Sequence, residues 1–580
     1  MGGGGGFCVE CPVTNAVRVQ GNLERRVRHL QRVVLAMSFP LAAHVPSVAA
    51  QQSPGATLAR AVEADVIGAH LALLADDALE GRGTGQRGGE LAAKYLAGQF
   101  ARLGLEPAGD DGTYYQRIPL VGQTTAPALR VGGDSIEPVT DFVAYVAGRD
   151  SAAAVSGEPV FVGYGIVAPE QQWDDYAGLD VRGKIVLALA GTPADQDSTL
   201  FKGARGDYGF RLYKVNEAMR QGAAAAFVIY HADAVPVPWA SLAQSWAGEQ
   251  VQLDRPAESG SLRIGGWLNE PAARRLVERG RADFAALVAA SARPGFRAVT
   301  LPVPLQSTVT ARTRTIPAVN VVGRLPGRGR LAEEAVVLGA HYDHLGIGAP
   351  VAGDSIYNGA FDNASGTAGM LAVAEAFVRS GARPSRSVLF VGFGAEENGL
   401  LGSEVFVARP PLPLPRMAAM INLDVVALIG ESRDLAALGA DQSSLGKLFR
   451  VAAAAEGFRL TPVDAPVLVE AEQQDFFDRS DQAPFARAGV PALFLYGAPH
   501  DFVGRPAGWG KEQLDQYLQR HYHQPSDELG LGLDARFGVR PLRVVARTLL
   551  AAADLPAQPT WAKASPYHEA GERRMSGAAK

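Results

Sequence analysis

The sequence predicts an α/β protein with a doubly wound, mostly parallel sheet and a smaller α/β unit inserted into it. From about residue 297 onward, short buried strand-like runs alternate with helix-like runs, which is typical of a parallel sheet covered by helices. A second series of the same kind occupies residues 156–295. The chain of 580 residues is also longer than one hydrophobic core usually supports.

The first segment of the main domain is expected at residues 56–155. Apolar residues recur at helical spacing through LARAVEADVIGAHLALLA and GGELAAKYLAGQFARLG, which predicts helices between residues 57 and 105. The polar, glycine-rich stretch LEGRGTGQRG between them predicts a loop.

The inserted unit is expected at residues 156–295. The runs GEPVFVGYGIV and VRGKIVLALAG are bounded by glycine and predict strands. LYKVNEAMRQG predicts a helix that ends at Gly222, and AAAAFVIYH predicts another strand after it.

The second segment of the main domain is expected at residues 296–556, followed by a C-terminal tail at 557–580. Strands are predicted in PAVNVVGRLPG, EAVVLGAHYD, SVLFVGFGAEE and MAAMINLDVV. NASGTAGMLAVAEAFVRSG predicts a helix between the second and third of these strands.

Residues 1–50 are typical of a signal peptide. Five arginines precede the apolar run VVLAMSFPLAAHVPSVAA, and small residues come directly before Gln51. We therefore expect export to the periplasm or the medium; the alternative is a misplaced start ahead of a cytosolic enzyme. Cys8 and Cys11 lie in this segment, so the mature protein would have no disulfide. No other apolar run is long enough to span a membrane.

Composition and charge narrow the class of partner. Hydrophobic residues make up 47% of the chain and charged residues 20%, which is ordinary for a globular protein. The net charge is −5, so the chain has no basic excess with which to bind phosphate backbones. Nucleic acid is therefore excluded as an expected partner.

Acidic and histidine side chains gather where the predicted strands end. In an open parallel sheet these carboxyl ends meet at one crevice. Nitrogen and carboxylate ligands without cysteine suit a borderline divalent cation, and a pair of such ions requires a bridging carboxylate. A water between two cations loses its proton easily, which predicts metal-dependent hydrolysis. The residues are His341, Asp343, Asp362, Glu396, Glu397 and Asp424.

Five strings then resemble the co-catalytic zinc exopeptidases, the family of bacterial leucyl aminopeptidases and glutamate carboxypeptidase. They are GAHYDHLG, NGAFDNASGTAG, GAEENGLLGS, NLDVV and YHQPSDE, in the family's order. The resemblance implies two Zn²⁺ ions and a zinc exopeptidase fold. It implies that His341 and Asp424 bind one ion, that Glu397 and His523 bind the other, that Asp362 bridges them, and that Glu396 is the general acid and base.

The same resemblance implies roles for neighbouring residues. Asp343 would hold the His341 imidazole in its metal-binding tautomer, and Tyr522 would steady the oxyanion. Arg479 would contact substrate. The Asp362–Asn363 peptide bond would be cis. The chain has Gln482 where relatives often have histidine, which puts the shape or polarity of the pocket in doubt.

Plainer roles remain open for three of these residues. Asp343 could form a surface salt bridge, Tyr522 could serve packing, and Arg479 could pair with Asp478 or Asp481.

The stretch GLEPAGDDGTYYQRIPL also resembles the family's N-terminal part, and residues 156–295 resemble a protease-associated domain.

The expected function is that of an exported exopeptidase that acts on peptides and releases amino-terminal residues. A carboxypeptidase, a dipeptidase or another amide hydrolase would use the same metal ligands. A receptor-like relative without catalysis would be expected to lose ligands, and none is lost here. The oligomeric state is left open.

Overall fold

The computed structural model describes residues 53–148, 150–193, 202–203, 206–235, 237–254, 262–473 and 476–577. The expected signal segment, residues 1–50, lies outside this part. None of the helices in the described part is both long and apolar enough to cross a bilayer.

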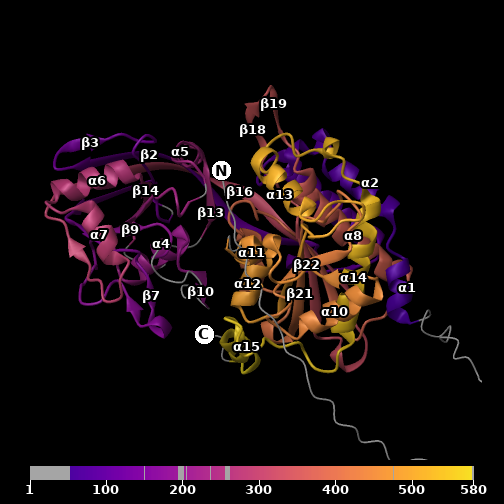
Figure 1. Ribbon diagram of the computed structural model, residues 1–580. Helices are drawn as coiled ribbons and strands as arrows, with labels where there is room; N and C mark the ends of the chain where they lie inside the picture. Colours follow the sequence, from indigo (N-terminus) through magenta and orange to yellow (C-terminus); the bar gives the residue numbers. More distant parts are fainter. Residues whose placement is uncertain are drawn as a thin grey trace, which may run out of the picture. The chain divides into compact units, whose positions relative to one another are not determined.

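Four parallel strands form the centre of the large sheet, as predicted. β20 (Ser387–Phe393), β17 (Ala335–His341), β21 (Met417–Asp424) and β24 (Ala492–Tyr496) lie side by side in that order. Figure 1 labels β21, which has helices around it. Nearly every residue of these strands is buried, which is expected when helices cover both faces of a parallel sheet.

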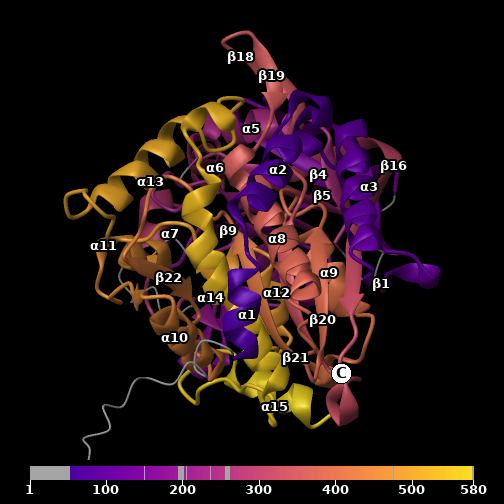
Figure 2. The same ribbon diagram turned by 90° about the vertical axis from the view of Figure 1, so that its right-hand side faces the viewer.

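Alternate residues of the central strands enter two different cores. Val336 and Leu338 of β17 pack with the helices of one face, whereas Val337 packs on the other face with Phe406 and Phe485. This follows from the two-residue period of a strand. The first face is covered by α1 (Pro54–Arg60), α2 (Ala64–Leu74), α3 (Arg87–Arg102), α8 (Ser365–Arg379), α10 (Leu445–Ala455) and α14 (Ala535–Asp554) (Figure 2). The other is covered by α9 (Leu401–Ala408) and α12 (Gln482–Arg487).

Antiparallel strands extend the sheet on both sides, which the sequence did not predict. β2 (Tyr115–Val131) and β16 (Leu305–Leu325) pair along 17 residues, and β16 also pairs with β20. Beyond β24, β22 (Asp434–Leu438) runs antiparallel and pairs with β23 (Arg459–Leu460). The outer half of β16 alternates buried and exposed residues, because one face of this strand is open to solvent.

A second, six-stranded sheet with hydrophobic cores of its own runs through the expected inserted unit. This sheet begins before residue 156 and ends after residue 295. Its two antiparallel edge strands are β4 (Phe142–Val146) and β15 (Val299–Thr300). The parallel strands are β6 (Pro159–Phe161), β9 (Ile185–Leu189), β12 (Ala225–Ile229) and β14 (Ile264–Leu268).

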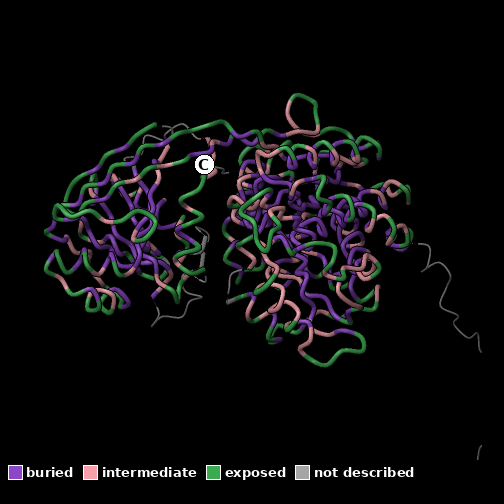
Figure 3. Tube along the Cα trace, turned by 90° about the horizontal axis from the view of Figure 1, so that it is seen from above, coloured by how far each residue is buried: buried purple, intermediate pink, exposed green. Residues whose placement is uncertain are grey.

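Shorter elements complete the fold. Buried residues, purple in Figure 3, are concentrated in the strands and the inner faces of the helices. The remaining helices include α4 (Arg211–Arg220), α5 (Trp239–Ala247), α6 (Glu270–Arg279), α7 (Phe284–Ser291), α11 (Pro466–Gln473), α13 (Trp509–Arg520) and α15 (His568–Met575). The remaining strands include β1 (Glu106–Pro107), β3 (Asp134–Ile136), β5 (Ala152–Gly157), β13 (Gln250–Leu253), β18 (Gly346–Val351) and β19 (Asp354–Tyr357).

The expected C-terminal tail, residues 557–580, is part of the folded core over its described residues. Trp561 and Tyr567 are 5% and 4% exposed and pack on the face that carries Phe485. Two aromatic side chains in so short a segment bury enough apolar surface to hold it against the domain.

Candidate metal centre

The structure brings the predicted metal ligands together at the carboxyl edge of the central sheet. His341 is the last residue of β17 and Asp424 is the last residue of β21, its parallel neighbour. Glu397 follows β20 on the other side of β17, and Asp362 lies in the turn that precedes α8. His523 comes from the loop after α13.

Asp362 lies between two pairs of side chains. Its Oδ1 is 3.3 Å from Nε2 of His341, and the same nitrogen is 3.2 Å from Oδ1 of Asp424. Its Oδ2 is 3.5 Å from Nε2 of His523, which is 3.0 Å from Oε2 of Glu397. Each carboxylate oxygen of Asp362 therefore faces one histidine and one acidic partner.

This donor set fits two divalent cations. Each half offers one imidazole nitrogen and one carboxylate, and Asp362 supplies an oxygen to both, which is the arrangement that a bridging ligand requires. Nε2 of His523 is buried without a hydrogen-bond partner among the described residues, although two carboxylates lie near it. A metal ion would satisfy that nitrogen.

The carboxylates make the cluster strongly attractive to positive charge. Burial alone would lower the pKa of His341, but Glu396, Asp424 and Asp362 outweigh burial and raise it well above its usual value. Burial likewise opposes charge on His523, yet Glu397 and Asp362 raise its pKa to about 10. The carboxylates around each imidazole therefore favour positive charge at this place.

Comparison with known proteins points to one family of peptidases. Residues 320–535 match the model of peptidase family M28. This part of the chain is similar to that family. The matched segment includes the four predicted metal ligands from His341 to Asp424 as well as His523.

Two curated relatives share part of this segment. Leupeptin-inactivating enzyme 1 of Streptomyces exfoliatus is 30% identical over 213 residues, which is 36% of this chain and 43% of the relative. Aminopeptidase YwaD of Bacillus subtilis is 28% identical over 215 residues, or 36% of this chain and 39% of the relative. The chain thus matches less than half the length of either relative. A solved structure, the aminopeptidase from Aneurinibacillus sp. strain AM-1, has a TM-score of 0.45 at 20% identity over 87% of this chain and 97% of its own.

Glu396, the predicted base, lines a pocket of about 80 Å³ together with four predicted ligands, His341, Asp362, Glu397 and Asp424. Burial raises its pKa well above the usual range for a glutamate, and Glu397 and Asp424 add to the effect, whereas His341 opposes it. A carboxyl group placed in this way can accept and donate a proton as a general base and a general acid.

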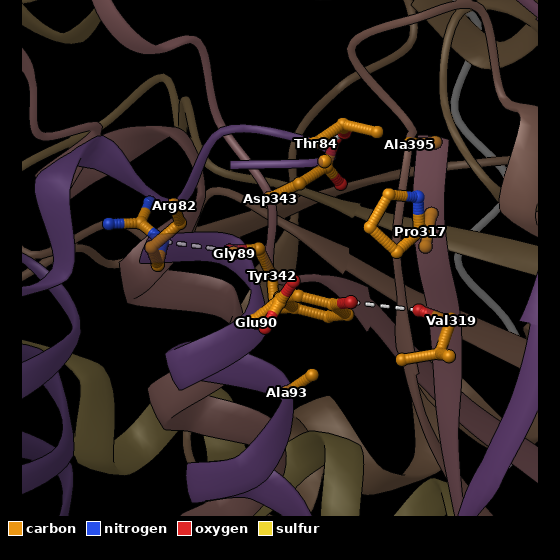
Figure 4. A pocket seen from close by; sticks show the side chains of 12 residues that line it. Arg82, Thr84, Gly89, Glu90, Ala93, Pro317, Val319, Tyr342, Asp343 and Ala395 are labelled. Carbon is orange, nitrogen blue, oxygen red and sulfur yellow. Dashed lines mark hydrogen bonds between the residues drawn. The ribbon is translucent and has the colours of Figure 1, made fainter. Parts of the chain in front are cut away.

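Asp343 holds the site through different atoms from those expected. Nδ1 of His341 lies 3.1 Å from the backbone carbonyl oxygen of Asp343 but 3.9 Å from its carboxylate. The carboxylate accepts hydrogen bonds from the Thr84 hydroxyl at 3.0 Å and from the Glu396 N–H at 3.1 Å. The carbonyl therefore orients the imidazole, and the carboxylate fixes the loop that carries Glu396. Thr84 and Asp343 point toward each other beside a cavity of about 80 Å³ (Figure 4).

Arg82 binds the backbone of the two loops that carry His341 and Asp362, a role that the sequence did not reveal. Its fully buried guanidinium donates to four backbone carbonyls, those of Leu74, Tyr342, Asn358 and Gly359. The Tyr342 carbonyl follows the His341 strand end, and the Asn358 and Gly359 carbonyls precede the Asp362 turn. Figure 4 shows the hydrogen bond from Arg82 to Tyr342. The only signal in the sequence was an arginine within the glycine-rich loop LEGRGTGQRG.

Asp527 binds the backbone N–H groups of the Asp362 turn, whereas Arg82 binds its carbonyls. Its fully buried carboxylate accepts from the backbone N–H groups of Phe361 at 2.9 Å and Asp362 at 3.0 Å, and from the Tyr517 hydroxyl at 2.9 Å. The sequence placed Asp527 in the string YHQPSDE but gave it no role.

The Asp362–Asn363 peptide bond is cis, as expected. Asn363 then links this turn to the end of β21. Its Oδ1 accepts from the Val425 N–H at 3.1 Å, and its Nδ2 donates to the Leu423 carbonyl at 2.9 Å. The two loops that carry Asp362 and Asp424 are thereby held together.

Tyr522 and Arg479 line the same pocket. Tyr522 stacks on His523 with ring centroids 3.8 Å apart, and the Arg479 guanidinium lies 5.0 Å from the centre of the Phe476 ring. Gln482 is fully buried: it accepts from Asn422 at 2.9 Å and donates to the Phe477 carbonyl. Gln482 itself does not line the pocket, but it binds the backbone of Phe477, the neighbour of the pocket residue Phe476.

Proposed function

We propose that this protein is an exported two-zinc exopeptidase that releases amino-terminal residues from peptides. The observation that carries the proposal is the pairing of His341 with Asp424 and of His523 with Glu397 on either side of Asp362. The two relatives described above, an aminopeptidase and an enzyme that inactivates leupeptin, support action on peptides.

The chain's ligands divide between the two metal positions. His341 and Asp424 would hold one zinc ion, Glu397 and His523 the other, and Asp362 both. Two bound zinc ions would supply an acidified water and polarise the scissile carbonyl.

Glu396 moves the proton during peptide hydrolysis. Its carboxylate accepts the proton of the attacking water and then donates it to the leaving amine, as a general base that becomes a general acid. Its raised pKa favours holding the proton between these two transfers. The hydrogen bond from its own N–H to Asp343 fixes the backbone from which the side chain reaches into the pocket.

Two pocket side chains would contact the substrate. The Tyr522 hydroxyl would donate to the oxygen of the tetrahedral intermediate, which is electrostatic stabilisation of the developing charge. Arg479 lines the same pocket and would contact a polar or acidic group of the peptide.

Arg479 also favours a second candidate, a carboxypeptidase. A guanidinium binds carboxylate through paired hydrogen bonds, so a terminal carboxylate is a natural partner for it. The terminus that is cleaved thus depends on which end of the peptide Arg479 meets.

The inserted α/β unit resembles a protease-associated domain in its sequence, and we include that assignment in the proposal. Export rests on the arginine-rich, apolar start of the chain.

A substrate-profile assay tests the proposed terminus. Purified protein is offered aminoacyl-p-nitroanilides, carboxyl-blocked peptides and amino-blocked peptides. Cleavage of the first two classes is expected, because both have a free amino terminus. Cleavage of amino-blocked peptides alone would replace the aminopeptidase with the carboxypeptidase. Metal analysis should find about two zinc ions per folded chain.

A further inference from the structure

A second buried histidine contacts the metal ligands and has no role in the mechanism above. Nδ1 of His344 lies 2.7 Å from Oε1 of Glu397, and the His344 side chain is fully buried. His344 follows Asp343 in the string GAHYDHLG, and the sequence gave no reason to count it among the ligands.

The two oxygens of Glu397 are used differently. Oε1 faces His344, whereas Oε2 lies 3.0 Å from Nε2 of His523, on the side where the second ion would bind. An ionised carboxylate can only accept hydrogen bonds, so Nδ1 of His344 must carry the proton and donate it. The bond therefore fixes both the tautomer of His344 and the rotation of the Glu397 carboxylate.

The surrounding chain holds the His344 ring in place. Its backbone N–H donates to the Arg82 carbonyl at 3.4 Å, and its ring meets the His523 ring edge to face at 5.6 Å. Gly359 makes room for the ring: a Cβ at that position would lie 2.5 Å from Cγ of His344. With φ of +57°, Gly359 also has a backbone conformation that favours glycine.

We propose that His344 is a positioning residue for the second metal ion, which it serves by holding Glu397 so that Oε2 alone faces the cation. This inference rests on the proposed two-zinc function. Hydrogen bonds to the outer oxygen or nitrogen of a metal ligand orient that ligand, and their loss typically weakens metal binding 10- to 100-fold.

Zinc affinity tests the proposal without relying on turnover. In His344→Leu the donor is lost, and we expect affinity for the second zinc ion to fall about 10- to 100-fold while the first ion binds as before. In His344→Asn the amide nitrogen takes the place of Nδ1, so affinity for the second ion should remain close to that of the wild type. Competition titration against a chelator measures both affinities.

A matched control separates positioning from the general loss of a buried imidazole. His70 is buried and bonded through Nδ1 to the Tyr95 hydroxyl at 2.7 Å, among residues that bind no predicted metal. His70→Leu should therefore leave both zinc affinities unchanged. Equal second-site affinity in His344→Leu and wild type would overturn the proposal. An equal loss in His344→Asn and His344→Leu would also overturn it, because it would indicate that the ring nitrogen itself binds the metal.

If His344→Leu does not fold, His344→Asn is compared with His344→Gln instead. The glutamine amide nitrogen lies at the position of Nε2, so it cannot make the bond to Oε1, and second-site affinity should be lower than in the asparagine variant. Equal affinities would contradict the positioning role. Failure of the wild type to bind two zinc ions would instead contradict the two-zinc function, so the two failures are distinguishable.

Discussion

Replacing Asp527 by asparagine should weaken both the fold and the metal centre. The Asp527 carboxylate is fully buried and accepts two consecutive backbone N–H groups, those of Phe361 and Asp362, with one oxygen for each. The side-chain amide of asparagine has a single oxygen. In either orientation its NH₂ group faces one of the two backbone donors, and that donor is left without an acceptor.

The size of the effect follows from that one orphaned donor. A buried N–H without a partner costs about 1–3 kcal/mol of unfolding free energy. The Tyr517 hydroxyl adds little to this figure, because a hydroxyl can rotate and accept from the amide instead. Since one of the affected donors is the N–H of the bridging residue Asp362, both zinc affinities should fall together.

Urea unfolding with and without zinc, together with zinc titration, measures the two effects. The matched control is Glu528→Gln, which neutralises the adjacent, exposed carboxylate and should change the unfolding free energy by less than about 0.5 kcal/mol. The reasoning is refuted if Asp527→Asn unfolds at the same urea concentration as the wild type and binds both zinc ions with unchanged affinity.

Three further predictions concern the base, the metal and pH. Glu396→Gln should bind two zinc ions but lose about 10²- to 10⁴-fold in kcat, and near-native turnover would remove Glu396 from the proton transfer. Removal of zinc by a chelator should lower the melting temperature, and free zinc at about 100 times Kd should restore about 2.7 kcal/mol per site; an unchanged melting curve would contradict a preformed site. Burial raises the pKa of Asp175 from 3.8 to about 7, so its contribution to stability is complete below about pH 4 and is lost as pH rises through 7. At about 1.4 kcal/mol per pKa unit that contribution is at most about 4 kcal/mol, and Asp175→Asn should flatten the dependence of unfolding free energy on pH between about 4 and 7.

The clustering of the candidate metal ligands could be predicted because their positions follow from the ends of the predicted strands. His341 and Asp424 end neighbouring parallel strands, and Glu397 follows a third, so the fold must bring them to one edge. His523 follows no predicted strand, so it could be assigned only from its place in the family-like string YHQPSDE. The combination of histidine and carboxylate ligands then indicated the kind of metal ion.

The supporting residues could not be predicted, because their partners are backbone groups far away in the chain. Arg82 binds carbonyls at positions 342, 358 and 359, more than 250 residues away, and any sequence has carbonyls there. Asp343 shows the same limit in another form. The sequence predicts that Asp343 lies close to His341. It does not predict that the Asp343 carbonyl lies against the His341 imidazole while the Asp343 carboxylate accepts from the Glu396 N–H.

Two oppositely charged side chains hold the Asp362 turn: the cation Arg82 binds backbone carbonyls, and the anion Asp527 binds backbone N–H groups. Arg82 binds its carbonyl side at Asn358 and Gly359, and Asp527 binds its N–H side at Phe361 and Asp362. Each ion offsets part of the cost of burying the other, since the Asp527 carboxylate favours the charged form of Arg82. Arg82 lies outside the segment 320–535 that matches the family. The geometry of the bridging ligand therefore depends on the N-terminal loop of the chain as much as on the family segment that contains the ligands.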